Sequence, residues 1–360
     1  MNWTLAPIAQ LEGLARHWDA LALRLGGLPF LESHFLLPLL REFGRGDEWL
    51  AFATEGSGPD APWCAALILQ RSGRLGWSSF QPSQLPTGPV LLPRHTRLPQ
   101  DLDGLLRRLP GPALLLGLTQ LDEALLPVPP QDRPRLASQP YIQTAWVEVA
   151  GSFEDYWEAR GKNLRQNTRK QLKKVEAAGM QPRLDCLREP AQMAEAVQQY
   201  GQLESSGWKA GEGTAIAADN AQGRFYLAML ENFARQGRAR VYRYRFNDAV
   251  VAMDLCIEQA GQLIILKTAY DQAHNAVSPA TLMRQEQFQQ LFAEGSIRRI
   301  EFYGRVMEWH TRWTEQQRGL YHLNLYRLDL LRRLHQRGQT QAAAAAAPAA
   351  SASAPAEPAA

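Results

Sequence analysis

The stretch 263–291 changes from a strand pattern to a helix pattern, and its turn is suited to binding an anion. Residues 263–266 form an uninterrupted apolar run, as in a strand covered on both faces, and helical spacing follows over 282–291. Ser278 and Pro279 are typical of an N-cap and a first helical residue. The next backbone N–H groups lack intrahelical partners, so the turn is predicted to attract a phosphate. The same pair also starts ordinary helices that bind nothing.

A second candidate binding segment is a run of basic residues on a predicted helix from Phe153 to Ala178. The basic residues follow acidic first turns, which suits the helix dipole, so a solvated helix explains the order. Their density favours an anionic partner. The run contains no acid and consists of Arg160, Lys162, Arg165, Arg169, Lys170, Lys173 and Lys174.

A third candidate is the loop that carries Trp208 and Lys209 beside Gly211 and Gly213. A large aromatic ring and a cation on a flexible loop are suited to covering a ligand. Trp208 could equally anchor the loop to the core.

The elements that must position these residues lie in the second part of the chain. Three strands at 239–246, 250–257 and 263–270 are joined by short polar links, which predicts an antiparallel meander. The helix from Pro279 follows, and a strand at 297–303 returns beside the meander. The remaining predicted elements are strands at 142–149, 180–187 and 321–326 and helices at 191–203 and 221–236.

The first part of the chain predicts a separate α/β unit. It contains helices at 5–25, from Ser33 and at 102–109, and strands at 49–53, 63–70, 74–77 and 113–118. Residues 127–140 contain five prolines and no usable period, which predicts a linker. Residues 339–360 are predicted to be a disordered tail, since thirteen of the last twenty residues are alanine. The predicted domains are therefore 1–126 and 141–338.

Composition excludes few functions. The chain has 360 residues, 45% of them hydrophobic, and a formal net charge of +3, so no global electrostatic argument for nucleic acid or membrane binding follows. The three cysteines lack metal-ligand spacing, and no metal site is expected. Neither a signal peptide nor a transmembrane segment is visible, which favours a cytoplasmic location.

Four segments in this order resemble the GNAT acyltransferase superfamily, specifically the FemAB-like branch that includes CelD-type polysaccharide-biosynthesis acetyltransferases. They are KNLRQNTRKQLKKVEAAG at 162–179, SGWKAGEGTAI at 206–216, AYDQAHNAVSPATLM at 269–283 and GRVMEWHTRW at 304–313. The resemblance implies an α/β fold with a mixed, mostly antiparallel sheet flanked by helices. It covers about residues 142–327, and by fold analogy 1–126 would be a second, degenerate GNAT-like domain.

Two positions depart from the branch. Its last motif usually reads Gly, four residues, Tyr-Lys, two residues, Trp, whereas Trp309 and His310 stand here for Tyr-Lys. Its Ser-Pro-Gly turn has Ala280 in place of glycine. These departures also allow a binding protein that has kept the fold without catalysis.

The resemblance implies an N- or O-acyltransferase that uses acetyl-CoA or another acyl-CoA as co-substrate. The acceptor, a small molecule or glycan precursor of the cell envelope or an exopolysaccharide, would attack the thioester directly. Glu301, His310 or Asp254 would be the base, and Tyr270 would protonate the thiolate. The acyl-CoA would bind Lys267, Thr268, Ala269, Tyr270, Ser278, Pro279, Ala280 and Thr281, and the acceptor would bind Trp208, Lys209, Arg165, Arg169, Arg305 and Trp313.

A different donor, aminoacyl-tRNA, is the alternative that the FemAB group offers. The basic helix would then contact RNA phosphates, and binding would weaken steeply with salt. The helical arm usual in those proteins is not visible, so this donor ranks second.

Overall fold

A computed structural model describes residues 1–56, 58, 61–131, 133–205, 216–217 and 219–346. The loop residues Trp208 and Lys209 lie outside the described residues.

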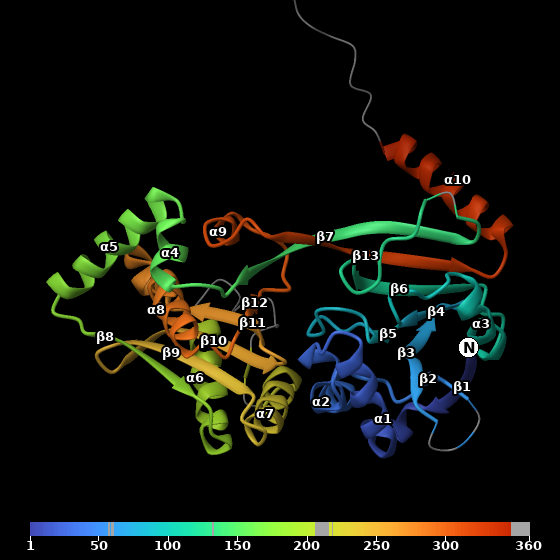
Figure 1. Cartoon of the computed structure of the whole chain (residues 1–360), viewed down its shortest axis with the longest axis horizontal. Coiled ribbons are helices and arrows are strands. Elements are labelled where there is room, and N and C mark those ends of the chain that lie inside the picture. The colour runs from blue at the N-terminus through green and yellow to red at the C-terminus, as the bar shows by residue number, and fades with distance from the viewer. Residues whose placement is uncertain (57, 59–60, 132, 206–215, 218, 347–360) are drawn as a thin grey trace, which may run out of the picture.

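The first half of the chain forms one end of a large mixed sheet (Figure 1). Its helices begin with α1 (Leu11–Arg24), whose buried Leu11, Trp18 and Leu21 recur at helical spacing. The other two are α2 (Ser33–Phe43) and α3 (Asp103–Arg108). Its strands are β1 (Asn2–Pro7), β2 (Trp49–Thr54), β3 (Trp63–Ser72), β4 (Gly76–Ser79), β5 (Val90–Leu91) and β6 (Leu115–Asp122).

The second half forms the other end of the sheet, and its helices cover both faces. The helices are α4 (Phe153–Glu158), α5 (Lys162–Ala177), α6 (Met193–Ser205), α7 (Ala221–Ala234), α8 (Pro279–Glu294), α9 (Glu308–Thr311) and α10 (Asp329–Ala346). The strands are β7 (Leu136–Glu148), β8 (Pro182–Leu187), β9 (Ala239–Phe246), β10 (Ala249–Gln259), β11 (Gln262–Tyr270), β12 (Arg299–Glu301) and β13 (Gln317–Tyr326).

The long strand β7 and the last strand β13 join the two halves. The sheet order is β1-β2-β3-β4-β6-β13-β7-β12-β11-β10-β9-β8, so β13 lies between β6 of the first half and β7 of the second. Both strands run from one half of the molecule to the other in Figure 1. The predicted linker is therefore wrong over Leu136–Pro140, because these residues pair with β13. The domain bounds 1–126 and 141–338 stay a proposal that must accommodate this shared strand.

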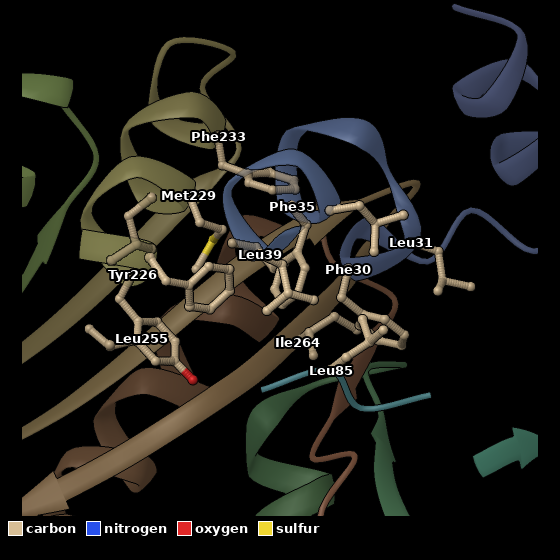
Figure 2. Packing of buried hydrophobic residues seen from close by; sticks show 14 of the residues in the cluster. Phe30, Leu31, Phe35, Leu39, Leu85, Tyr226, Met229, Phe233, Leu255 and Ile264 are labelled. Atoms are coloured by element: carbon tan, nitrogen blue, oxygen red, sulfur yellow. The ribbon is translucent and has the colours of Figure 1, made fainter. Parts of the chain in front are cut away.

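A hydrophobic core also spans the two halves. Helix α2 packs against α7 over β10 and β11, and Phe35 meets Phe225 edge to face at 5.2 Å. Figure 2 shows side chains of α2 and α7 pointing toward one another, with Leu255 and Ile264 of the sheet below them. The halves therefore bury one continuous apolar cluster.

Three predicted segments, two helices and the tail, differ from the structure for local reasons. The helix predicted over 5–25 begins only at Leu11, because residues 2–7 pair with β2 as β1. The helix predicted over 153–178 is broken between α4 and α5, where Gly161 is the N-cap of α5. The predicted tail is helical up to Ala346, and residues 347–360 lie outside the described part.

The meander is confirmed, since β9, β10 and β11 pair antiparallel in sequence order. Strand β12 is shorter than predicted and pairs parallel to β11 only at Gln262, Leu263 and Ile264. Beyond Ile264, the β12 side of β11 has no strand partner within the described residues. This open edge faces the turn at Ser278 that precedes α8.

Candidate active site

A cavity of about 350 Å³ lies where the open edge of β11 meets the start of α8. We call it the inner cavity. It contains six of the predicted binding and catalytic residues: Thr268, Tyr270, Ser278, Ala280, Thr281 and Trp313. The other lining residues are Leu164, Asn275, Arg284, Trp309 and Arg312. The sequence-predicted turn therefore does border a pocket, with polar groups set among aromatic walls.

A β-bulge decides which side chains of β11 face this cavity. The register with β10 shifts between Leu255 and Cys256, so β11 carries one extra residue there. As a result Leu266 and Lys267 both face α6 and α7: Leu266 packs on that core, and Lys267 donates to Glu204 at 2.8 Å. Thr268 is thereby turned toward α8.

Lys267, Ala269 and Pro279, which we predicted to bind the acyl-CoA, do not line the inner cavity. Lys267 is tied to α6, Ala269 is buried in the core under α7, and Pro279 is buried at the first position of α8. Side chains alternate across a strand, so three successive residues of β11 cannot all face one pocket.

A buried polar network forms one wall of the inner cavity. Asp254 of β10 accepts hydrogen bonds from Thr268 Oγ1 at 2.5 Å and from Arg284 Nη2 at 3.1 Å. Arg284 Nη2 also donates to Thr268 Oγ1 at 3.0 Å. Asp254 is fully buried and Arg284 is 2% exposed. Asp254 is therefore already held by an ion pair, which leaves its carboxylate poorly suited to take a proton from an acceptor.

Ser278 adopts an unusual backbone conformation at the cavity mouth. Its φ is +46°, and its side chain makes no cap hydrogen bond to the helix, unlike the predicted N-cap. The chain reverses sharply there because a 3-10 helix, Gln272–Val277, directly precedes α8. Ser278 Oγ instead accepts from Gln171 Nε2 of α5 at 3.0 Å. A non-glycine residue in this region is a strained position of the kind found at binding sites.

A second cavity, of about 480 Å³, continues from this mouth, and we call it the outer cavity. Leu164, Ser278, Thr281 and Arg312 line both cavities. The other residues of the outer cavity are mostly polar: Ala159, Arg160, Gly161, Asn163, Asn167, Gln171, Glu308, Thr311 and Glu315. The two cavities form one groove that passes the N-terminus of α8.

His310 lies behind the inner cavity rather than in its lining. Its Nδ1 accepts from the Met307 backbone N–H at 2.9 Å, and its ring stacks on Trp309. Burial lowers the pKa of His310 to about 4, and the charge of Arg284 contributes. The neutral ring therefore carries its proton on Nε2 and offers a donor instead of the lone pair that a base needs.

Glu301 lies on the opposite face of the sheet, in a third cavity that we call the junction cavity. It is paired with Ile264, four residues before Thr268, which corresponds to about 13 Å along the strand. The junction cavity also contains Asp122, Tyr303 and Arg318. Glu301 is 1% exposed and pairs with Arg318 Nη1 at 3.0 Å. The structure therefore does not bring Glu301 to the inner cavity.

Stability should depend on pH through Glu301. Burial raises the pKa of Glu301 to about 7 from 4.5, although the charge of Arg318 opposes the rise. Between these pH values the folded protein holds a proton that the unfolded chain releases, so the free energy of unfolding falls as pH rises from 4.5 to 7. Wild type should lose about 3 kcal/mol relative to Glu301→Gln across this window. Urea titrations of both proteins at pH 5, 6, 7 and 8 measure the difference, and parallel profiles would contradict the assignment.

The predicted acceptor-binding residues are mostly dispersed. Trp313 lines the inner cavity but is 3% exposed and packs on Phe288. Arg165 donates to the Arg160 carbonyl, while Arg169 and Arg305 are exposed outside the inner cavity. Trp208 and Lys209 lie outside the described residues.

Arg284 is the site residue that sequence reasoning missed. A signal was present, because Arg284 stands four residues before Phe288 and seven before Leu291 and so falls on the apolar face of its helix. Charged residues are almost never fully buried unless paired, so such a position predicts a buried partner. Asp254, within an otherwise apolar strand, is that partner.

Neither a metal site nor a membrane span emerges from the described residues. No cluster of three or more His, Cys, Asp or Glu side chains in the described part could hold a metal ion. In the same part, no helix is long and apolar enough to cross a membrane.

Comparison with known proteins places this site in a known domain. Residues 162–311 match the acetyltransferase (GNAT) domain family, and this range contains α8 and the inner cavity apart from Trp313 and Arg312. No curated protein is similar enough in sequence to match. Residues 162–311 therefore form an acyltransferase domain of the GNAT type.

Solved structures extend the similarity to nearly the whole chain. FemX is 8% identical, with a TM-score of 0.56 over 89% of this chain and 98% of that chain. The C-terminal domain of a putative lysylphosphatidylglycerol synthetase from Agrobacterium fabrum is 12% identical, with a TM-score of 0.53 over 91% and 96%. The chain therefore shares its fold with these two proteins over nearly its whole length.

Proposed function

We propose that this protein transfers an acetyl or other short acyl group from coenzyme A to an amine or hydroxyl acceptor. The single observation that carries the proposal is the continuous groove formed by the inner and outer cavities at the N-terminus of α8. A helix N-terminus attracts the diphosphate of coenzyme A through its free N–H groups and its dipole. The open edge of β11 next to it supplies backbone groups for the amide-rich arm of the donor.

The two cavities differ in a way that gives the groove a direction. The outer cavity is polar and contains Asn163, Asn167 and Gln171, which suits the nucleotide and its phosphates. The inner cavity is walled by Trp309, Trp313 and Leu164, which suits the acyl end. The acyl group is therefore proposed to lie between Thr268 and α8.

Tyr270 is our proposed proton donor for the departing thiolate. It lies at the end of β11, lines the inner cavity and is 38% exposed, so its hydroxyl is accessible to both ligand and water. Asp254, His310 and Glu301 are the bases predicted from the sequence, and each has an obstacle to that role: an ion pair, a donating ring nitrogen and the opposite face of the sheet, respectively. We therefore propose that the acceptor attacks as a free amine or passes its proton to water.

The acceptor is proposed to be a cell-envelope or exopolysaccharide precursor, handled in the cytoplasm. This part of the proposal rests on the sequence resemblance to the CelD-type branch and on no contact in the structure.

Calorimetric titration with acetyl-CoA and coenzyme A tests the donor. Both should bind, and Thr281→Glu should weaken binding at least about tenfold, because it places a negative charge where the groove meets the start of α8. Glu176→Gln, on the exposed end of α5, is the matched control and should bind as wild type does. If neither acetyl-CoA nor coenzyme A binds at millimolar concentration, the proposed acyl-CoA donor is wrong.

An aminoacyl-tRNA donor is the second candidate, and one observation favours it. The basic residues of α5 form an exposed groove lined by Gln166, Arg169, Lys170, Lys173, Lys174 and Ala177. A structure with the FemX fold and such a surface could contact RNA phosphates. Salt-sensitive binding of aminoacyl-tRNA, with no binding of acetyl-CoA, would decide for this donor.

A further inference from the structure

Arg284 occupies the deep part of the inner cavity, away from the entrance. Leu164, Ser278, Thr281 and Arg312 line both cavities and so mark the entrance. Arg284 lies further along α8. Like Thr268 and Trp309, it lines the inner cavity but not the outer cavity. Whatever reaches the deep end of the groove meets this guanidinium.

One nitrogen of Arg284 has no hydrogen-bond partner among the described residues. Nη2 makes the bonds to Asp254 and Thr268, whereas Nη1 is buried and unpartnered. The guanidinium lies over the ring of Trp309 at 5.3 Å and over that of Phe302 at 5.6 Å, which fixes its plane. A buried N–H without an acceptor is costly, so a ligand oxygen at Nη1 would be favoured.

The charge around Arg284 indicates what kind of oxygen fits. Asp254 already neutralises the guanidinium, at 3.1 Å from Nη2, and both groups are buried. The site therefore does not require a full negative charge on the ligand. A carbonyl oxygen, whose negative charge grows during reaction, matches a fixed donor of this kind.

We propose that Arg284 Nη1 donates a hydrogen bond to the thioester carbonyl oxygen of the acyl donor and stabilises the charge that develops on it. In the transfer, the acceptor nitrogen or oxygen forms a bond to the carbonyl carbon, and the carbonyl π electrons move to the oxygen beside Arg284. When the carbonyl re-forms, the C–S bond breaks and its electron pair leaves on sulfur, which takes up a proton from Tyr270. The acceptor loses one proton from its attacking nitrogen or oxygen to water. This inference rests on the acyl-CoA function proposed above.

A pair of ligands that differ by the carbonyl oxygen tests the contact without any acceptor. Acetyl-CoA has this oxygen, and S-ethyl-CoA, a thioether of nearly the same shape, lacks it. Wild type should bind acetyl-CoA at least about tenfold more tightly than S-ethyl-CoA, as expected for a hydrogen bond to a charged donor. Equal affinity for the two ligands would overturn the inference while leaving acyl-CoA binding intact.

Removing Arg284 alone would leave the Asp254 carboxylate buried without its ion-pair partner, so two variants are chosen to avoid this effect. Arg284→Lys retains a positive charge for Asp254 but removes Nη1, and the double variant Asp254→Asn with Arg284→Gln removes both charges. Each should lose the preference for acetyl-CoA while still binding S-ethyl-CoA. Arg235→Gln, which removes an exposed cation at the end of α7, outside both cavities, is the control and should keep the preference.

The carbonyl stretch of acetyl-CoA labelled with carbon-13 gives a second measurement. A hydrogen bond to the oxygen should lower this frequency in wild type and in Arg235→Gln, and the frequency should return toward its value in water in Arg284→Lys. Unchanged frequency in Arg284→Lys would contradict the contact. If neither ligand binds wild type, the acyl-CoA function itself fails, and this inference fails with it.

Discussion

Asp254→Ala is expected to lower the free energy of unfolding by about 3–5 kcal/mol. The substitution leaves Arg284 buried without its carboxylate, and arginine cannot shed its charge by losing a proton. The loss should therefore be similar from pH 6 to pH 8. Urea unfolding followed by circular dichroism measures it.

Two further variants isolate the cause of that loss. Asp254→Leu combined with Arg284→Met removes both charges and should recover most of the stability, because apolar pairs replace buried ion pairs at little cost. Glu308→Ala breaks the exposed pair with Arg312 and should cost less than about 1 kcal/mol. An Asp254→Ala loss no larger than that of Glu308→Ala would contradict a buried ion pair in the cavity wall.

Arg318→Met should be the other strongly destabilising substitution. Arg318 is 7% exposed and pairs with Asp122 at 2.8 Å and with Glu301 at 3.0 Å. Its removal takes the ion-pair partner from buried Asp122 and leaves Glu301 with the more distant, exposed Arg299 at 3.7 Å. Breaking a buried pair costs about 3–5 kcal/mol. Glu301 can escape part of this cost by taking a proton, since burial already raises its pKa to about 7. The loss should therefore be larger at pH 8 than at pH 6.

The exposed pair between Arg97 and Asp101 provides the comparison. Arg97→Ala should change stability by less than about 1 kcal/mol at either pH, because the Arg97 side chain is 79% exposed. Denaturant midpoints at both pH values distinguish the two variants. Equal losses at pH 6 and pH 8 for Arg318→Met would exclude Glu301 as the responsible group.

Local patterns predicted the second half well because its elements follow one another in space. The three strands of the meander have alternating or buried patterns and short links. The structure confirms their order, and their bounds agree with the predicted bounds to within two residues. The errors fall where distant segments pair. Residues 2–7 form a strand only because β2 lies beside them, and Pro140 enters β7 only because β13 covers it.

The candidate site was located from the sequence, but its contacts were not. The Ser-Pro turn, whose signal is local, borders the inner cavity, and its role in binding stays a prediction. The face on which Thr268 and Glu301 lie depends on a bulge at Leu266 and on the register of β12, and neither is visible in a pattern of residue types. Arg284 and Asp254 meet only in the fold.

The central position of β13 also constrains the order in which the chain can mature during synthesis. Until residues 317–326 leave the ribosome, β6 and β7 each expose an edge that β13 will later cover. The first half therefore cannot complete its sheet when its own residues have been made, although it comes first in the sequence. Closing contacts between residue 115 and residue 326 spans more than half the chain, so the final assembly step is long-range and slow.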